Sequence, residues 1–433
     1  MGVRCGVGIS FRTGIDAAIE QCAEMLGAQL AGDERAGDVR ASGADLLCVF
    51  ASGAHAGEVA RATGALRAMF DAGVTIGTGA EGVLGGTRES LGEHGAIVAW
   101  AARLPGARLT PVRVGELVDA WSGEPGDPAG LSGPMGAAED LRALVVVCDP
   151  FSVPIVGLLP AMCAARARDA SGVPIGFIAG GMASAGRHPR ENVMVLDDEV
   201  LHEGGVGVAI SGGVRVDPIL SQGCRPIGRT HVITKAQKNM VYTLGGRRAL
   251  EVVQETIMEL PDRDKKLLSR GLFMGRVVNE YQDRFGRGDF LVRGVNHADE
   301  NTGAIAVGDL VRTGQTVQLH VRDADSASQD LAMLLDAQTL HGPPAGVLAF
   351  TCNGRGTRLF DRLDHDALAL SRLFDSVGTP GPQMARVGRE IDTGRATPAI
   401  GGMFAAGEIG PVGGESYLHG HSVSALVFRE CVL

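Results

Sequence analysis

Short apolar runs and amphipathic stretches alternate along much of this chain. Residues 46–50 (LLCVF) form an apolar run that ends in Ala-Ser-Gly, a pattern typical of a buried strand that runs into a turn. Ile15, Ile19, Cys22 and Leu26 recur at steps of four, three and four residues, so they predict one face of a helix. The chain is therefore expected to contain both strands and helices in its core.

The same order of strand, helix and strand occurs three times. Apolar runs at 46–50, 144–148 and 346–350 each precede a segment with helical periodicity and then another apolar run. Residues 81–86 (EGVLGG) also resemble residues 408–414 (EIGPVGG), which indicates an internal repeat. This alternation favours an α/β fold, with α+β as the alternative. We expect two related α/β units with mixed sheets, and sheets packed between helix layers would suit them.

The length and a change of character near Leu220 divide the chain. A chain of 433 residues is too long for one ordinary core, so two or more structural units are expected. We predict one α/β domain over residues 1–220 and a second over 221–433. Residues 122–138 and 379–396 are rich in turn-forming or charged residues and are expected to be loops.

Composition and charge narrow the class of partner. The chain carries 40 basic and 50 acidic residues, a formal net charge of −10, which disfavours binding to nucleic acid or to an anionic membrane. No apolar segment is long enough to cross a bilayer, and the first residues lack a secretory signal pattern. The eight cysteines form no CxxC pair, so reduced thiols are expected and a zinc site has no support. A cytoplasmic location is expected.

A GxGxxG pattern occurs at residues 77–82 (GTGAEG), directly after an apolar run. A dinucleotide site requires such a loop to open a helix whose N-terminus faces the pyrophosphate. The residues that follow, Val-Leu-Gly-Gly-Thr, are poor at starting a helix. The pattern alone therefore does not indicate a nucleotide site.

Cys352 and Asn353 follow a predicted buried strand, in the segment FTCNGRG at residues 350–356. Polar residues at strand ends are where α/β folds place ligands. Arg355 and Arg358 would lower the pKa of a nearby thiol and hold a carboxylate. The alternative is a buried cysteine that acts as a small apolar residue. A cysteine nucleophile also needs a base, which the sequence does not reveal, so an enzyme using Cys352 is the less favoured reading.

The last segment concentrates polar side chains among glycines: Glu408, Glu415, His419 and His421. On an extended strand the two histidines would project to the same face, where they could bind a metal or the iron of haem. The alternative is that these groups satisfy turn backbone and one another. Two histidines are an incomplete site, so we expect no cofactor, with haem as the alternative.

Two arginines also precede or end strand-like runs. Arg225 lies before a proline, and Arg293 ends the run FLVR. Arginine suits bidentate capture of a carboxylate or phosphate, although a surface ion pair is the more common role.

Several segments of the chain, given at the end of this paragraph, resemble segments of the FIST family. The similarity covers residues from about 220 to the C-terminus in the order typical of the FIST C-terminal region, while the N-terminal half matches more loosely, through the order of its elements and Ser52-Gly53. The segments that carry it are 223–228 (GCRPIG), 289–293 (DFLVR), 303–309 (GAIAVGD), 314–318 (GQTVQ), 350–356, 406–414 (AGEIGPVGG) and 417–422 (YLHGHS).

The resemblance implies a sensory protein that binds a small ligand such as an amino acid. Some members of the family bind haem and sense nitric oxide. No signalling output segment is recognisable here, so a separate protein partner would receive the signal. The family has no agreed catalytic residues to transfer, so the candidate ligand-binding residues rest on motif positions: Arg225, Arg293, Cys352, Asn353, Arg355, Glu408, Glu415 and His419.

Overall fold

The computed structural model describes residues 2–31, 43–282, 284–375 and 397–431. Helices and strands alternate in it, which confirms the α/β class. The chain forms two compact units. The first unit contains Met1–Leu220, Ala332–Leu418 and Val423–Leu433, and the second contains Ser221–Leu331 and His419–Ser422. The chain thus leaves the first unit near residue 220, where the sequence changes character, and later returns to it.

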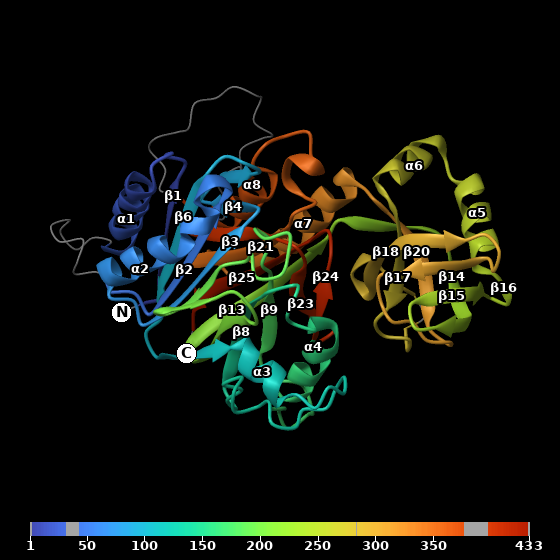
Figure 1. Cartoon of the computed structure of the whole chain (residues 1–433), viewed down its shortest axis with the longest axis horizontal. Coiled ribbons are helices and arrows are strands. Elements are labelled where there is room, and N and C mark those ends of the chain that lie inside the picture. Colours follow the sequence, from blue (N-terminus) through green and yellow to red (C-terminus); the bar gives the residue numbers. More distant parts are fainter. Residues whose placement is uncertain (1, 32–42, 283, 376–396, 432–433) are drawn as a thin grey trace. The chain divides into compact units, whose positions relative to one another are not determined.

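Three repeats of one topology make up most of the first unit, and each contributes six strands and two helices (Figure 1). The first repeat consists of β1 (Arg4–Ser10), α1 (Ile15–Ala31), β2 (Leu46–Ser52), α2 (Val59–Phe70), β3 (Val74–Ala80), β4 (Gly82–Gly85), β5 (Arg88–Leu91) and β6 (Ala96–Arg103). The second consists of β7 (Ala107–Arg113), α3 (Val114–Ala120), β8 (Leu141–Cys148), α4 (Ile155–Ala164), β9 (Phe177–Met182), β10 (Met194–Leu196), β11 (Glu199–Leu201) and β12 (Gly205–Gly212). The third consists of β13 (Val214–Gln222), α7 (Ala324–Thr339), β21 (Gly346–Cys352), α8 (His365–Ser371), β22 (Ile400–Ala405), β23 (Glu408–Val412), β24 (Glu415–His419) and β25 (Ser422–Glu430).

The repeats exchange hairpins in a cycle. The three sheets have the orders β1-β6-β2-β3-β10-β11, β7-β12-β8-β9-β23-β24 and β13-β25-β21-β22-β4-β5. Each repeat therefore supplies four strands of its own sheet and places its β-hairpin on the sheet of another repeat. Because the second repeat completes the first sheet, the third completes the second and the first completes the third, the exchange closes on itself. The third copy of the strand and helix order, predicted from the sequence, is confirmed.

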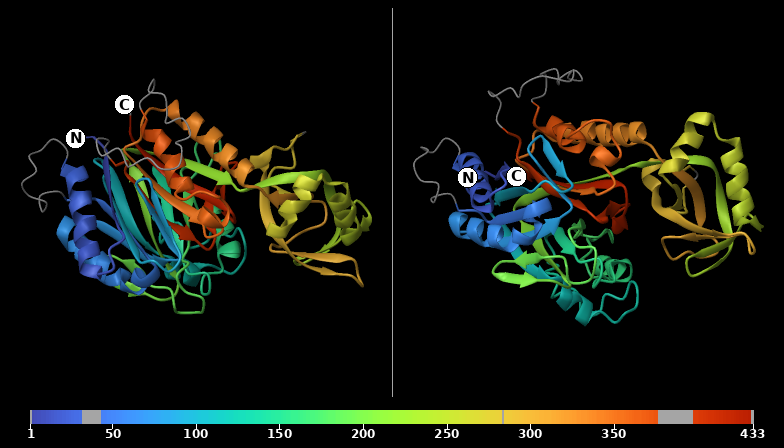
Figure 2. Two further views of the ribbon diagram at one scale, coloured as in Figure 1. Left: turned by 90° about the horizontal axis from the view of Figure 1, so that it is seen from above. Right: turned by 45° about the horizontal axis from the view of Figure 1, so that its top comes forward.

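The core of the first unit lies between the inner faces of these sheets. One apolar cluster combines Phe50 and Trp100 of the first sheet with Val145 of the second and Phe350 of the third. Helices α1 and α2 cover the outer face of the first sheet (Figures 1 and 2), and α3 and α4 cover that of the second. Each helix thus buries its apolar face on a sheet, as the amphipathic patterns predict.

Strands from different repeats approach closely, which explains the abundance of small residues. A Cβ atom added to Gly181 of β9 would lie 2.8 Å from the Cβ of Ala405 in β22. One added to Gly401 of β22 would lie 2.5 Å from the Cβ of Trp100. Side chains cannot occupy these distances, so glycine is required at both positions.

A single hydroxyl joins all three repeats at the carboxyl ends of their strands. Ser184 of the second repeat donates to the Phe404 carbonyl of the third (2.6 Å) and accepts from the Glu81 amide of the first (2.9 Å).

We expect Ser184→Ala to lower the free energy of unfolding by about 1–3 kcal/mol, because it leaves a buried donor and acceptor unsatisfied. Urea denaturation would measure this. Ser171→Ala, on an exposed turn, is the control, and equal stability of the two variants would contradict the prediction.

The second unit is a closed antiparallel barrel with a small helical cover. Its strands pair in the order β14-β20-β17-β18-β19-β15, and β15 also pairs with β14, so the ring has no free edge. Helix α5 contributes Val252 and Val253 to a core that also contains Leu319 of β20. The elements are β14 (Cys224–Gln237), β15 (Met240–Leu244), β16 (Arg247–Arg248), α5 (Ala249–Glu259), α6 (Asp262–Leu267), β17 (Leu272–Val277), β18 (Phe290–Asp299), β19 (Ala304–Val307) and β20 (Thr316–Arg322).

The barrel is inserted between the first strand and the first helix of the third repeat. In the first repeat a short turn connects β1 to α1, and in the second repeat β7 leads directly into α3. Cys224 and Arg322, at the two ends of the insertion, are paired in neighbouring strands.

We therefore expect residues 224–322 alone to fold and to unfold cooperatively on heating, since they contain a closed sheet with its own core. A dispersed amide NMR spectrum would check this, and a spectrum of an unfolded chain would refute it.

Several expectations for single elements can be compared with the fold. The helix predicted over 367–374 is found as α8 and the short 3₁₀ helix Arg372–Phe374 that follows it. Strand β3 extends through the first part of the GxGxxG pattern, and strand β4 follows, so this pattern opens no helix. The predicted loop at 379–396 lies outside the described residues. None of the described helices is both long and apolar enough to cross a membrane.

Candidate functional site

A cavity of about 630 Å³ in the first unit combines charged and apolar side chains. It lies against the hairpin of the first repeat and the loop that leads into α8 of the third. We call it the Glu89 cavity. Its polar lining is Thr13, Arg88, Glu89, Ser90, Glu93, His94, Thr357 and Asp364, and its larger apolar lining is Phe11, Leu91 and Leu363.

The exchanged hairpin places Glu89 at this cavity. Strand β5, which carries Glu89, pairs with β4, and β4 pairs with β22 of the third repeat. The side chain is partly buried, and its Oε1 accepts the backbone amides of Asp366 (2.7 Å) and Ala367 (2.9 Å) in the first turn of α8. Glu89 therefore joins the first repeat to the third.

Asp366 is the centre of a buried polar network behind Glu89. The Arg355 guanidinium donates to both carboxylate oxygens of Asp366, from Nε and Nη2, each at 2.8 Å, and both side chains are fully buried. The Thr351 hydroxyl donates to the same carboxylate at 2.7 Å, and His365 Nδ1 lies 2.8 Å from it. His365 also stacks on the ring of Phe360. Several hydrogen bonds thus hold the Arg355–Asp366 pair in one geometry.

The two carboxyl groups have opposite pKa shifts. Burial raises the pKa of Glu89 to about 8, and the charge of Asp366 adds to this, although the two amide hydrogen bonds oppose it. Burial also acts to raise the pKa of Asp366, but the charge and hydrogen bonds of Arg355 hold it well below the usual range. At neutral pH, Asp366 is therefore ionised while Glu89 retains its proton for most of the time. Such separated values are characteristic of functional sites.

Asp364 connects the rim of the cavity to the same strand. Its Oδ1 accepts the Glu89 backbone amide at 2.7 Å, and its Oδ2 lies 3.4 Å from Arg88 Nε. The Arg88 guanidinium in turn lies over the ring of Phe11, 5.3 Å from the ring centre. Asp364, Arg88 and Phe11 thus present a carboxylate, a cation and an aromatic surface at the rim.

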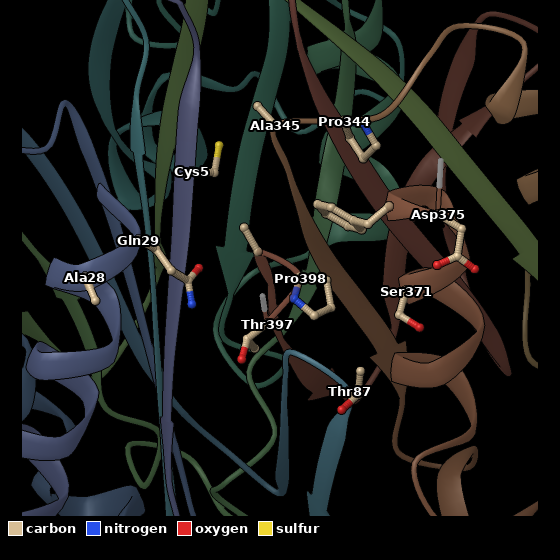
Figure 3. A pocket seen from close by; sticks show the side chains of 12 residues that line it. Cys5, Ala28, Gln29, Thr87, Pro344, Ala345, Ser371, Asp375, Thr397 and Pro398 are labelled. Carbon is tan, nitrogen blue, oxygen red and sulfur yellow. The ribbon is translucent and has the colours of Figure 1, made fainter. Parts of the chain in front are cut away.

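A second cavity, of about 550 Å³, is shown in Figure 3. Cys5, Gln29, Asp375 and Thr397 contribute to its lining. The amide group of Gln29 already bonds the backbone amide and carbonyl of Val7, each at 3.0 Å, and burial raises the pKa of the Cys5 thiol far above its ordinary value. Because these groups are engaged or inert, we regard the Glu89 cavity as the stronger candidate.

Three of the predicted ligand residues lie together at the end of β21. Cys352 is buried, and its Sγ accepts the Gly354 amide at 3.4 Å. Asn353 donates its backbone amide to Ala405, while its side-chain Oδ1 is buried and accepts no hydrogen bond. Arg355 is the partner of Asp366, so that carboxylate already occupies the position predicted for an anionic ligand group. The roles in ligand binding stay predictions.

Glu408 and Glu415 lie on the exchanged hairpin of the third repeat. Glu408 is fully buried, and its charge contributes to raising the pKa of Arg355. Glu415 accepts a hydrogen bond from the buried Arg166 at 2.7 Å. Glu408 thus interacts electrostatically with the network around Arg355, whereas Glu415 pairs with Arg166.

Arg225 and Arg293 belong to the barrel unit, where carboxylates lie beside them. Arg225 is bonded to Asp264 and, at 2.9 Å, to Asp323. Arg293 Nε lies 3.5 Å from Asp309. Both contacts are ion pairs, as in the alternative that the sequence left open, although Arg293 and Asp309 are largely buried and not on the surface.

The two histidines do not share a continuous strand. His419 is the last residue of β24 and is buried, whereas His421 has a φ of 62° and packs edge-on against Phe273, with ring centres 4.8 Å apart. The left-handed residue ends the extended geometry that would align the two rings. Within the described ranges, no group of three or more His, Cys, Asp or Glu side chains is arranged to hold a metal ion. Haem stays a prediction that this geometry does not favour.

The sequence did not point to Glu89, Asp366 or Asp364. Glu89 and Asp366 are separated by 277 positions, and neither lies in a motif. Only the exchange of hairpins between repeats brings them together. One indirect signal existed: Arg355, followed by a helix with an acidic residue in its first turn, is a pattern that can form an internal ion pair.

Comparisons with known proteins show the family to which the chain belongs. The model of the FIST N domain matches residues 45–247, and that of the FIST C domain matches residues 249–411. An uncharacterized protein of Mycobacterium tuberculosis is 34% identical over 435 residues, which cover 99% of this chain and 100% of that protein. An uncharacterized protein of Mycobacterium bovis is 32% identical over 429 residues, covering 97% of this chain and 99% of that protein. The chain, built from three hairpin-exchanging repeats and an inserted barrel, belongs to the FIST family of sensory domains.

Proposed function

We propose that this FIST protein is a sensor that binds a small, amino-acid-like ligand in the Glu89 cavity and signals through a separate protein partner. The observation that carries the proposal is the composition of the cavity. Arg88 provides a cation for a carboxylate, while Glu89, Glu93 and Asp364 provide acceptors for an amine. Phe11 and Leu91 provide apolar surface for a side chain. Its volume is within the range of small-molecule sites.

The position of the cavity also suits a sensor. A ligand there would contact the first repeat through β5 and the third through the loop before α8. Because Glu89 holds the amides of α8 and Arg88 holds Asp364, a bound ligand would change contacts that join two repeats. We propose that the partner protein reads this change on the surface around α8.

A thermal-shift screen of the purified chain against the amino acids and related metabolites tests the proposal. A ligand that binds only the native state raises the melting temperature, and the rise grows with the logarithm of the ligand concentration over Kd. We expect Arg88→Ala to abolish the rise and Arg61→Ala, which removes an exposed ion pair elsewhere, to keep it. No rise with any compound would contradict the proposal, and an absorbance spectrum of the same sample with a Soret band would favour haem instead.

A further inference from the structure

Glu89, Asp364, Asp366 and the two arginines that pair with these aspartates comprise three carboxyl groups and two cations. Arg355 forms a two-point contact with Asp366, and Arg88 lies beside Asp364, so these four groups balance in charge. Burial lowers the pKa of His365, so that ring is neutral above mildly acidic pH. Glu89 remains as a third carboxyl group for which the network supplies no cation.

Glu89 lines the cavity, and its two carboxyl oxygens have different surroundings. Oε1 accepts the two backbone amides of α8, whereas Oε2 has no hydrogen bond to any of the described residues. A Cβ atom added to Gly356 would lie 3.5 Å from Oε2, so the backbone of the turn after β21 comes close to this oxygen. A carboxyl group that lines a cavity, with one oxygen fixed by two amides, is oriented in advance to accept a donor from a ligand.

We propose that the Glu89 cavity takes a small organic cation, a primary ammonium group on a short hydrocarbon, and that the ammonium donates to Glu89 Oε2. The proposal rests on the proposed function and narrows its ligand class to amines. The ammonium supplies the cation that the network lacks, and Glu93 at the rim adds to the negative potential at the entrance. The hydrocarbon part would contact Phe11, Leu91 and Leu363, which are the larger apolar residues of the lining.

Binding would exchange one proton. In the free protein at neutral pH the Glu89 carboxyl group keeps its proton, because burial and Asp366 disfavour its anion. A bound ammonium favours the anion. The O–H bond of Glu89 then breaks, the electron pair stays on the carboxylate, and the proton passes to the solvent while the ligand keeps its positive charge. The other charged groups around Glu89 are Asp364, Asp366, Arg88 and Arg355.

The test uses three probes with four carbon atoms each and different charge: n-butylamine, n-butyrate and n-butanol. Isothermal titration at pH 7 in phosphate and in Tris separates the proton exchanged from the heat of binding. We expect only n-butylamine to bind, with release of close to one proton, and we expect the release to disappear above about pH 9.

Glu89→Gln is the informative variant, because its side-chain oxygen can still accept the two amides of α8. It should bind n-butylamine at least about tenfold more weakly and release no proton. Glu24→Gln, on the exposed side of α1 and outside the cavity lining, is the matched control and should leave the affinity unchanged.

The outcomes separate this inference from the proposed function. Binding of n-butylamine without proton release, or binding unchanged by Glu89→Gln, would overturn the inference. The inference would also be overturned if n-butyrate or a neutral metabolite bound in an Arg88-dependent way and no amine bound. In that case the proposed sensor function would stand. If neither the metabolite screen nor any probe gave binding, both would fail.

Discussion

Replacing Asp366 with alanine should lower the free energy of unfolding by about 3–5 kcal/mol, because it leaves the fully buried Arg355 guanidinium without its carboxylate. Thr351 and the amide-bonded Glu89 cannot replace the two-point contact. The charge of Glu408 also acts on Arg355, but it is present in both proteins, so the difference measures the loss of Asp366. Denaturation in urea, followed by circular dichroism, measures this loss. A decrease below about 1 kcal/mol would contradict the assignment of a buried pair, because exposed pairs have effects of that size.

Two further variants distinguish the loss of a partner from the intrinsic value of the pair. Asp16→Ala removes an exposed carboxylate that pairs with Arg61, and it should change stability by less than about 1 kcal/mol. The double variant Arg355→Met with Asp366→Leu removes both charges. It should recover much of the stability lost in Asp366→Ala, because the desolvation cost disappears with the charges. A double variant no more stable than the single one would indicate that the hydrogen-bond network itself is essential.

The stability of Glu89→Gln relative to the unmodified protein should increase as the pH rises. The pKa of Glu89 is about 8 in the folded protein, against an ordinary value of 4.5. Between these values the folded chain holds a proton that the unfolded chain has lost, so stability falls as the pH rises from about 4.5 to 8. Each pKa unit corresponds to about 1.4 kcal/mol, so this loss is on the order of a few kcal/mol.

Glutamine does not titrate, so the variant escapes this loss. We expect the melting temperature of Glu89→Gln relative to the unmodified protein to rise steadily from pH 5 to pH 8.5. Differential scanning calorimetry at several pH values measures the difference, and Glu24→Gln, on the exposed side of α1, controls for the substitution itself. Parallel pH profiles for Glu89→Gln and the unmodified chain would show that Glu89 titrates normally in the folded state.

The local patterns predicted the elements well because each element buries its own face. Ile19, Cys22 and Leu26 do lie on the buried side of α1, and residues 46–50 lie in the fully buried strand β2. The threefold recurrence was also readable, since each repeat must satisfy the same packing demands. Hairpin exchange was not readable, because β4 and β5 carry no local mark of the sheet that they join.

The candidate site shows the same division. Arg355 and Asn353 stood out because they follow a buried strand, and the structure places them there, at the end of β21. Whether Arg355 faces a ligand or an internal partner depends on Asp366, which α8 brings to it 11 residues later in the chain. Glu89 could not be identified at all, since its shifted pKa arises from burial and from Asp366, both of which are products of the fold.

The sequence by itself determined the α/β class, the three repeats, the FIST resemblance and the absence of a strong positive field, because periodicity, motif order and net charge are local or summed properties. Only the tertiary structure decided that the repeats exchange hairpins in a closed cycle, that the barrel is an insertion, and that Glu89, Asp364 and Asp366 meet. These features depend on contacts between segments hundreds of residues apart. No window of sequence contains them, because the free energy that selects them comes from packing the sheets of the first unit against one another.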